Sequence, residues 1–239
     1  MRSLNRRRKG RFRALLIVAA VGVVGGLYWL WDHRHYWLTH NFRVVDPGKV
    51  YAGGYQYPGP LRRIVSEYGI KTVLSLRYDD GGKADRMERK TLNQLGVRFL
   101  RVEIPFNRPM REQLAALNEC LRILTNPKLQ PVFVHCWGGQ HRTGIVVGAY
   151  RARVQALPEE QIWAEFDRYG GNTADPPYAQ QLLRAFLRRE QRRKARRQKE
   201  NVAVKAAPKT LRHKGNVDLP PAAKNTARAP ANQAAARNR

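Results

Sequence analysis

Cysteine is scarce in this sequence, which has only Cys120 and Cys136 in 239 residues. Two thiols can build neither a disulfide framework nor a cysteine-rich zinc site. The six histidines are scattered, and the pair His33 and His35 lies beside an apolar run, where histidine is more often interfacial than metal-binding. We therefore predict that the protein uses no metal and no other cofactor.

Acidic residues are also few, with 18 Asp and Glu against 45 Lys and Arg, a formal net charge of +27. Most of the excess lies in residues 1–13 and 188–239, so the chain between them has the size and balance of an ordinary single domain. Beyond residue 201 large apolar side chains are almost absent, which predicts a disordered tail. Such a tail could contact anionic lipids or nucleic acid, or could serve only to solubilise the protein.

Long apolar runs are limited to residues 14–31, which carry no charge. A helix of this length reaches about 27 Å, close to the ~30 Å hydrocarbon core of a bilayer. Aromatic residues cluster at its far end and no small-residue cleavage site follows, so we expect an uncleaved anchor rather than a signal peptide. The basic residues before it place the N-terminus in the cytoplasm and the domain on the non-cytoplasmic side of the membrane.

Strands and helices alternate through the middle of the chain. Apolar runs near 70–76, 97–104 and 131–134 predict strands, and helical patterns lie near 60–68, 84–95, 110–124 and 159–169. This alternation predicts an α/β fold with a parallel-rich central sheet flanked by helices. The predicted organisation is a basic cytoplasmic N-terminus (1–13), a transmembrane anchor (14–31), a juxtamembrane linker (32–40), one domain (41–188), and a basic helical extension with a disordered tail (189–239).

The most informative stretch runs from His135 to Gly144, between the predicted strand 131–134 and an apolar helix that continues through 145–150. A tight, glycine-containing loop between a strand and a helix N-terminus gathers backbone N–H groups and favours an anion. Cys136 opens this loop and Arg142 closes it. Such a setting favours the thiolate form of the cysteine, and the arginine fork can hold two phosphoryl oxygens.

Each residue of this stretch has a predicted role. Cys136 is the nucleophile and Arg142 binds phosphate, while the hydroxyl of Thr143 assists the thiolate and His135 fixes the cysteine. Together they predict a phosphocysteine intermediate that water later hydrolyses, with no metal. The phosphate-binding cradle consists of Trp137, Gly138, Gly139, Gln140, His141 and Arg142.

The motif His-Cys, five residues, then Arg-Thr resembles the signature of the protein tyrosine phosphatase superfamily. Its Gly-x-His-Arg-Thr-Gly ending is similar to that of plant and fungal atypical dual-specificity phosphatases and their bacterial relatives. The resemblance covers about residues 41–188 and includes the segment 44–54, the strand 70–77 and the spacing from Cys136 to Asp175 and Tyr178. The chain departs from that group at Gln140, where a lysine is usual, so one phosphate-facing charge is missing.

The resemblance also implies an aspartate that protonates the leaving group, placed just after an Ile-Pro pair. This chain has Asn107 near that place. Glu103 is our candidate for the general acid, with Asp79, Asp80 and Asp175 as alternatives. Because a missing acid penalises leaving groups of high pKa, we expect activity to favour leaving groups of low pKa, such as the phosphate of an anhydride.

The sequence thus predicts a membrane-anchored cysteine phosphatase of the tyrosine or dual-specificity type. It would act on a phosphorylated protein or a small phosphorylated substrate, as a monoester or an anhydride. The alternative is a catalytically weak, phosphate-binding membrane adaptor with basic tails. A rhodanese-like sulfurtransferase is a third interpretation, because a Cys-x5-Arg spacing also occurs there.

Overall fold

The computed structural model describes the backbone of residues 2–171 and 177–206, and the side chains of residues 17–34, 36–171 and 178–202 within them. Its contacts divide the chain into Met1–Arg193 and Lys194–Arg239. The first unit contains the sheet and the predicted site. Asp175 and residues 207–239 lie outside the described residues, and the predicted domain boundaries stay predictions. Residues 202–206, predicted to belong to the disordered tail, are instead the end of a helix.

A five-stranded sheet forms the centre of the first unit, with the order β1-β2-β5-β3-β4. The β1–β2 pair is antiparallel, whereas β2–β5, β5–β3 and β3–β4 are parallel. The predicted parallel-rich α/β sheet is therefore confirmed as a mixed sheet with one antiparallel edge strand. The strands are β1 (Arg43–Asp46), β2 (Val50–Gly53), β3 (Thr72–Ser75), β4 (Arg98–Arg101) and β5 (Val132–His135).

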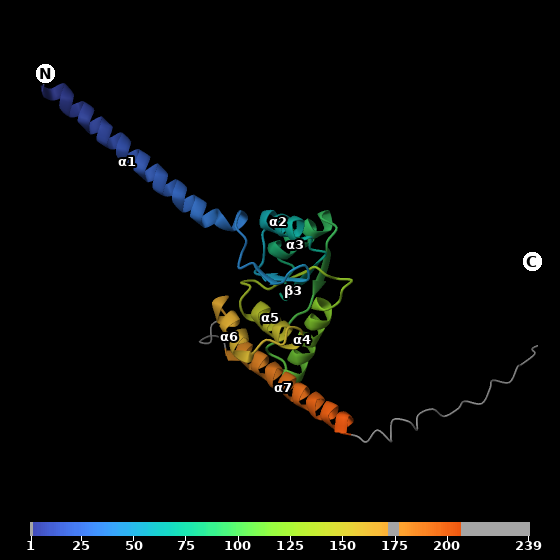
Figure 1. Cartoon of the computed structure of the whole chain (residues 1–239). Coiled ribbons are helices and arrows are strands. Elements are labelled where there is room, and N and C mark those ends of the chain that lie inside the picture. The colour runs from blue at the N-terminus through green and yellow to red at the C-terminus, as the bar shows by residue number, and fades with distance from the viewer. Residues whose placement is uncertain (1, 172–176, 207–239) are drawn as a thin grey trace, which may run out of the picture. The chain divides into compact units, whose positions relative to one another are not determined.

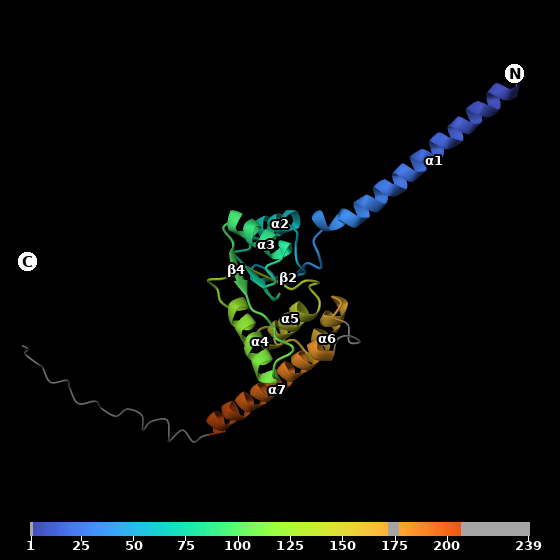
Figure 2. The same ribbon diagram turned by 180° about the vertical axis from the view of Figure 1, so that it is seen from behind.

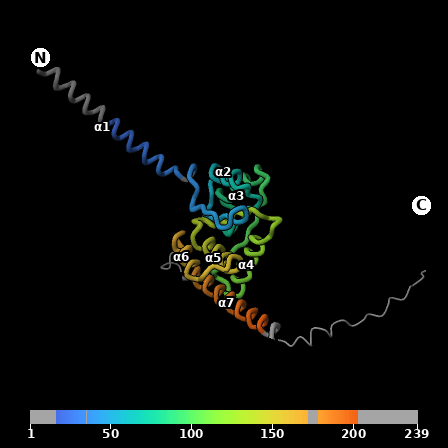
Figure 3. Tube along the Cα trace, viewed as in Figure 1, coloured from blue at the N-terminus to red at the C-terminus, as the bar shows by residue number. Residues whose placement is uncertain are grey.

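Helices cover both faces of this sheet. Figures 1 and 2 show α2 and α3 on one face and α4, α5 and α6 on the other, and the Cα trace in Figure 3 follows the same arrangement. The helices are α1 (Arg2–Asp32), the 3-10 helix η1 (His33–Tyr36), α2 (Pro58–Tyr68), α3 (Lys83–Gln94), α4 (Met110–Leu124), α5 (His141–Arg153), α6 (Glu159–Arg168) and α7 (Pro177–Ala206).

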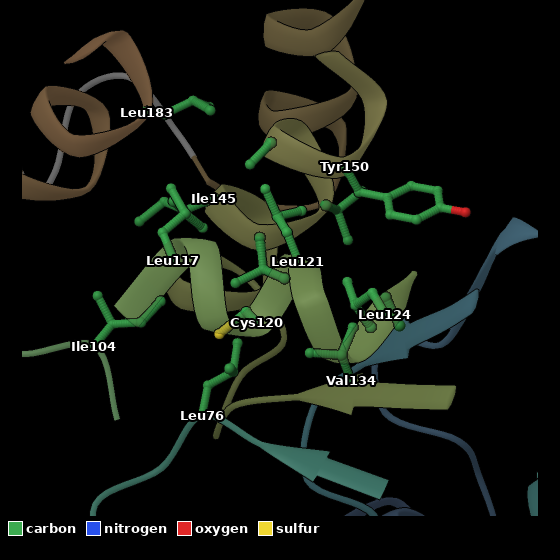
Figure 4. Packing of buried hydrophobic residues seen from close by; sticks show 14 of the residues in the cluster. Leu76, Ile104, Leu117, Cys120, Leu121, Leu124, Val134, Ile145, Tyr150 and Leu183 are labelled. Atoms are coloured by element: carbon green, nitrogen blue, oxygen red, sulfur yellow. The ribbon is translucent and has the colours of Figure 1, made fainter. Parts of the chain in front are cut away.

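The helix predicted over residues 110–124 corresponds to α4. Its apolar side chains recur at the helical period and are buried, so the stripe faces the sheet. Figure 4 shows this face of α4, where Leu117, Cys120 and Leu121 pack near Leu76 and Val134 of the sheet side. Burial of one leucine side chain contributes about 1.5–3 kcal/mol, so this packing fixes the position of α4 against the sheet.

Side chains along β5 alternate between the two faces, as the period of a strand requires. Val132 and Val134 join the apolar cluster under α4 and α5, whereas Phe133 joins the cluster formed with α2 and α3. His135, two residues after Phe133, therefore projects toward the α2 and α3 face. It is fully buried there and stacks on Phe133 at 5.5 Å between ring centroids.

The transmembrane helix predicted over residues 14–31 is not confirmed. Within the part of the chain whose side chains are described, no helix is long and apolar enough to cross a membrane. The described side chains of α1 run from Ile17 to Asp32. Residues 14–16 of the predicted span therefore lie outside the described side chains. The placement of the domain on the non-cytoplasmic side stays a prediction.

Candidate active site

Cys136 and Arg142 line one pocket of about 260 Å³ at the carboxyl end of β5. The strand ends at His135, the loop follows, and α5 begins at His141, so the predicted strand, loop and helix are all present. Cys136 is only 5% exposed but still reaches the pocket. The lining comprises Cys136, Trp137, Gly138, Gln140, His141 and Arg142 from the loop and helix, with Phe106 and Tyr178 from elsewhere.

The carbonyl oxygens of the loop are held on its outer side by donors from residues 41–55. The Trp137 carbonyl accepts from the Tyr55 N–H (2.8 Å), the Gly138 carbonyl from Asn41 Nδ2 (3.1 Å), and the Gly139 carbonyl from Arg43 Nη1 (3.1 Å). In a planar trans peptide the following N–H points the opposite way. The N–H groups of Gly138, Gly139 and Gln140 are thereby turned toward the pocket side, as an anion cradle needs.

Gly139 is required where the loop passes the end of β2. Its φ is +73°, and a Cβ built there would lie 2.4 Å from both the Gly53 carbonyl carbon and the Gly54 nitrogen. These are backbone atoms and cannot move aside like a flexible side chain. Glycine therefore meets both a conformational and a steric demand at this position.

Arg43 supports the loop from within the protein. It is 5% exposed, and its guanidinium carbon lies 4.0 Å from the centre of the Tyr169 ring. Burial lowers the pKa of Arg43, while the charge of Glu165 opposes that shift. A lowered arginine pKa still leaves the side chain cationic at neutral pH, so a positive charge lies beneath the cradle.

The Arg142 guanidinium is available for an anion. Its carbon lies 4.6 Å from the Tyr78 ring centre and 5.4 Å from that of Phe106, so aromatic rings hold the side chain. Its Nε is buried with no hydrogen-bond partner among the described residues. A phosphoryl group bound in the pocket would supply the missing acceptors, since arginine binds phosphate through paired N–H donors.

Thr143 contacts the end of β2 and His135 contacts Cys136, but neither contact repeats the predicted role in full. The Thr143 hydroxyl donates to the Gly53 carbonyl at 3.3 Å, so in this structure its proton is directed at β2 rather than at the Cys136 sulfur. His135 Nδ1 lies 3.1 Å from the Cys136 carbonyl oxygen. That contact agrees with a role in fixing the cysteine, and both assignments stay predictions.

Of the candidate general acids, Glu103, Asp79 and Asp80 are not among the residues that line the pocket, and Asp175 lies outside the described residues. Glu103 is exposed and accepts a hydrogen bond from the Asp79 N–H at 3.0 Å. Asp79 pairs with Arg89 and Arg101, and Asp80 pairs with Arg77. No carboxylate belongs to the pocket lining in the part of the chain that the structure describes. The assignment of Glu103 stays a prediction without support from its position.

The remaining thiol and the carboxylates suggest no second centre. Cys120 is fully buried, and burial raises its pKa to about 12, so it stays a neutral thiol. Within the described ranges no group of three His, Cys, Asp or Glu side chains is placed to hold a metal ion.

Four residues that contact the loop or His135 were missed by the sequence analysis: Asn41, Arg43, Tyr55 and Glu88. They lie far from the motif in sequence and follow no spacing rule relative to it. Only Arg43 and Glu88 could have been noticed in the sequence, because each places a charge on the inward face of a strand or helix. A charged side chain is almost never fully buried unless it is paired, so such a position indicates a buried partner.

A comparison with family models matches residues 38–205 to the tyrosine phosphatase family. The chain is similar to inositol diphosphatase DSP4 of Arabidopsis thaliana, 28% identical over 139 residues, which are 56% of this chain and 66% of that protein. It is also similar to inositol diphosphatase SIW14 of Saccharomyces cerevisiae, 24% identical over 141 residues, 54% of this chain and 48% of that protein. The chain thus spans less than two thirds of the length of these curated relatives.

Among solved structures, the fold matches the core catalytic domain of the PP-IP phosphatase SIW14 from S. cerevisiae, crystallised with citrate. The TM-score is 0.51 at 24% identity, covering 60% of this chain and 84% of that one. This match shows a shared fold. Together with the family match, it confirms the resemblance to atypical dual-specificity phosphatases inferred from the motif.

Proposed function

Because this chain belongs to the tyrosine phosphatase family, we propose that it hydrolyses phosphate monoesters or phosphoanhydrides through a phosphocysteine intermediate at Cys136. The observation that supports the proposal is the pocket itself, because Cys136 and Arg142 both line it together with the loop residues between them. A thiolate beside a cation and converging amide donors is suited to attack phosphorus.

The proposed reaction has two steps. In the first, the Cys136 thiolate forms a bond to phosphorus while the bond from phosphorus to the leaving oxygen breaks, and the leaving oxygen takes the electron pair. Arg142 and the loop N–H groups stabilise the charge on the three peripheral oxygens. In the second step water attacks the same phosphorus, the sulfur leaves as thiolate, and phosphate is released with the proton from water.

The pocket lining favours leaving groups that depart without a proton donor. No described lining residue is a carboxylate, so the described lining supplies no carboxylic acid to protonate an alkoxide as it leaves. A phosphate leaving group has a pKa near 6 and a tyrosine hydroxyl a pKa near 10, so the anhydride depends less on an acid. Two similar proteins are named inositol diphosphatases, which supports including phosphoanhydrides among the substrates.

A catalytically weak phosphate-binding adaptor is the second candidate, and the same lack of a lining carboxylate favours it. In such a protein the cradle and Arg142 would bind a phosphoryl group, while turnover at Cys136 would be negligible. The two candidates differ in turnover and not in binding.

The test is phosphate release by the full chain from a panel of p-nitrophenyl phosphate, pyrophosphate, an inositol pyrophosphate, a phosphotyrosine peptide and a phosphoserine peptide. We expect vanadate-sensitive release that Cys136→Ser abolishes and the control Cys120→Ala preserves. We also expect p-nitrophenyl phosphate and the anhydrides to exceed phosphoserine. Phosphate binding without turnover would favour the adaptor, and a strong preference for phosphoserine would overturn the assignment of leaving groups.

A further inference from the structure

Behind the loop, a buried carboxylate contacts the histidine that precedes the nucleophile. Glu88 on α3 places Oε1 2.9 Å from His135 Nε2, an ion-pair distance, and both side chains are almost completely buried, at 1% and 0% exposure. Neither of these two atoms has a hydrogen-bond partner among the described residues, so each is a buried polar atom whose charge state decides the contact. The contact follows from the fold, because the alternation of β5 directs His135 toward the face that α3 covers. The other ring nitrogen, Nδ1, lies 3.1 Å from the Cys136 carbonyl oxygen.

The ring therefore lies between two acceptors, a carboxylate oxygen and a carbonyl oxygen. A neutral imidazole has one N–H donor and one bare nitrogen, so a neutral ring beside an ionised carboxylate would turn a lone pair toward an acceptor. Only a doubly protonated ring satisfies both contacts if Glu88 is ionised. The alternative with the same number of protons is a neutral pair, in which protonated Glu88 donates to Nε2.

A cation lies beside the other oxygen of the Glu88 carboxylate. Arg77, which follows β3, has Nη1 at 4.0 Å from Glu88 Oε2. Asp85, on the same helix as Glu88, forms ion pairs with Arg89 and Arg101. The carboxylates that pair with Arg77 are those of Glu88 and Asp80. Tyr55, which follows β2, is neutral at physiological pH because burial first, and then the Glu88 charge, raise its pKa to about 12.

We propose that Glu88 is a positioning residue that holds His135 as a buried imidazolium directly behind the nucleophile. The inference rests on the proposed function for its catalytic consequence. The Nδ1–H fixes the Cys136 carbonyl on the outer side of the loop, which turns the Trp137 N–H toward the pocket side. The ring also carries a positive charge beside the sulfur-bearing residue, and a nearby cation favours the thiolate.

The first test is the protonation of His135, measured by ¹⁵N NMR of the ring nitrogens in the full chain with labelled histidine. We expect both nitrogens to show N–H signals through pH 6–8, and in Glu88→Gln we expect one nitrogen to lose its proton within that range. A single neutral tautomer in the unmodified protein overturns the proposal. This measurement needs no catalytic activity, so its failure is distinct from failure of the proposed phosphatase function.

The second test is the reactivity of Cys136 toward iodoacetamide as a function of pH. We expect Glu88→Gln to slow alkylation at pH 6 roughly tenfold, because losing a nearby cation disfavours the thiolate, and to shift the acid limb of kcat/KM upward. The control Glu112→Gln, an exposed carboxylate in the first turn of α4, should change neither. An unchanged alkylation profile in a folded Glu88→Gln protein would refute the effect on the nucleophile.

Discussion

Replacing Gly139 with alanine tests whether close packing of the loop against β2 sets the shape of the anion cradle. Alanine at a φ of +73° costs about 1–2 kcal/mol on conformational grounds. Its methyl group would also lie 2.4 Å from two backbone atoms of residues 53 and 54, and such overpacking costs about 1–3 kcal/mol. Together these effects predict a loss of roughly 2–5 kcal/mol in the free energy of unfolding.

The loop can relieve this overlap only by moving away from β2, which would disturb the N–H groups that face the pocket. A misplacement of about 1 Å at a catalytic site can cost roughly 100-fold in rate, so we expect activity to fall by about that factor. Urea denaturation measures the stability, and phosphate release from p-nitrophenyl phosphate measures the activity.

Gly69 provides a matched control, because it also has a positive φ, +61°, but a Cβ there would meet no atom within 4 Å. Gly69→Ala should therefore lose only about 1–2 kcal/mol and keep full activity. The reasoning fails if Gly139→Ala is no less stable than Gly69→Ala and retains normal phosphate release.

Three further predictions concern buried groups. Arg43→Met removes the donor to the Gly139 carbonyl and should weaken phosphate binding roughly 10–100-fold in competition assays, whereas Arg62→Met, an exposed change, should not. Cys120 should resist iodoacetamide at pH 7 in the folded protein because burial raises its pKa to about 12; recovery of a Cys120 adduct by mass spectrometry would contradict this. Burial and the Glu88 charge raise the pKa of Tyr55 to about 12, so the unfolded chain releases this proton from pH 10 while the folded protein retains it. Stability should fall between pH 10 and 12, and urea midpoints at pH 9 and 11 should differ less in Tyr55→Phe.

Local patterns in the sequence were sufficient to predict the centre of the fold and the strand and helix on either side of the loop that begins at Cys136. The stripe of α4 and the strand, loop and helix around Cys136 depend on residues close together in the chain. The contact between Glu88 and His135 could not be predicted in this way, because it depends on which face of the sheet α3 covers. The hydroxyl of Thr143 was assigned to the thiolate on local grounds, and its hydrogen bond to the Gly53 carbonyl at the end of β2 could not be predicted from residues close in sequence.

The transmembrane prediction illustrates a different limit. It rested on the length of the apolar run and on the absence of charge over residues 14–31. Both criteria must be applied to the whole run and cannot be applied to a part of it. The described side chains begin inside that run, at Ile17, and no helix among them satisfies the criteria.

The hydrogen bonds from Asn41 and Arg43 to Gly138 and Gly139 of the candidate phosphate-binding loop determine where an expression fragment of this protein can begin. A cut at Val44 would keep the apolar residues of β1. Such a cut would remove two of the three donors from residues 41–55 that secure the loop carbonyls. It would also remove His40, whose backbone bonds to Gln56 and Gly54. A recombinant fragment should therefore retain residue 40 and those after it, because a shorter one could stay folded and yet be unable to bind phosphate.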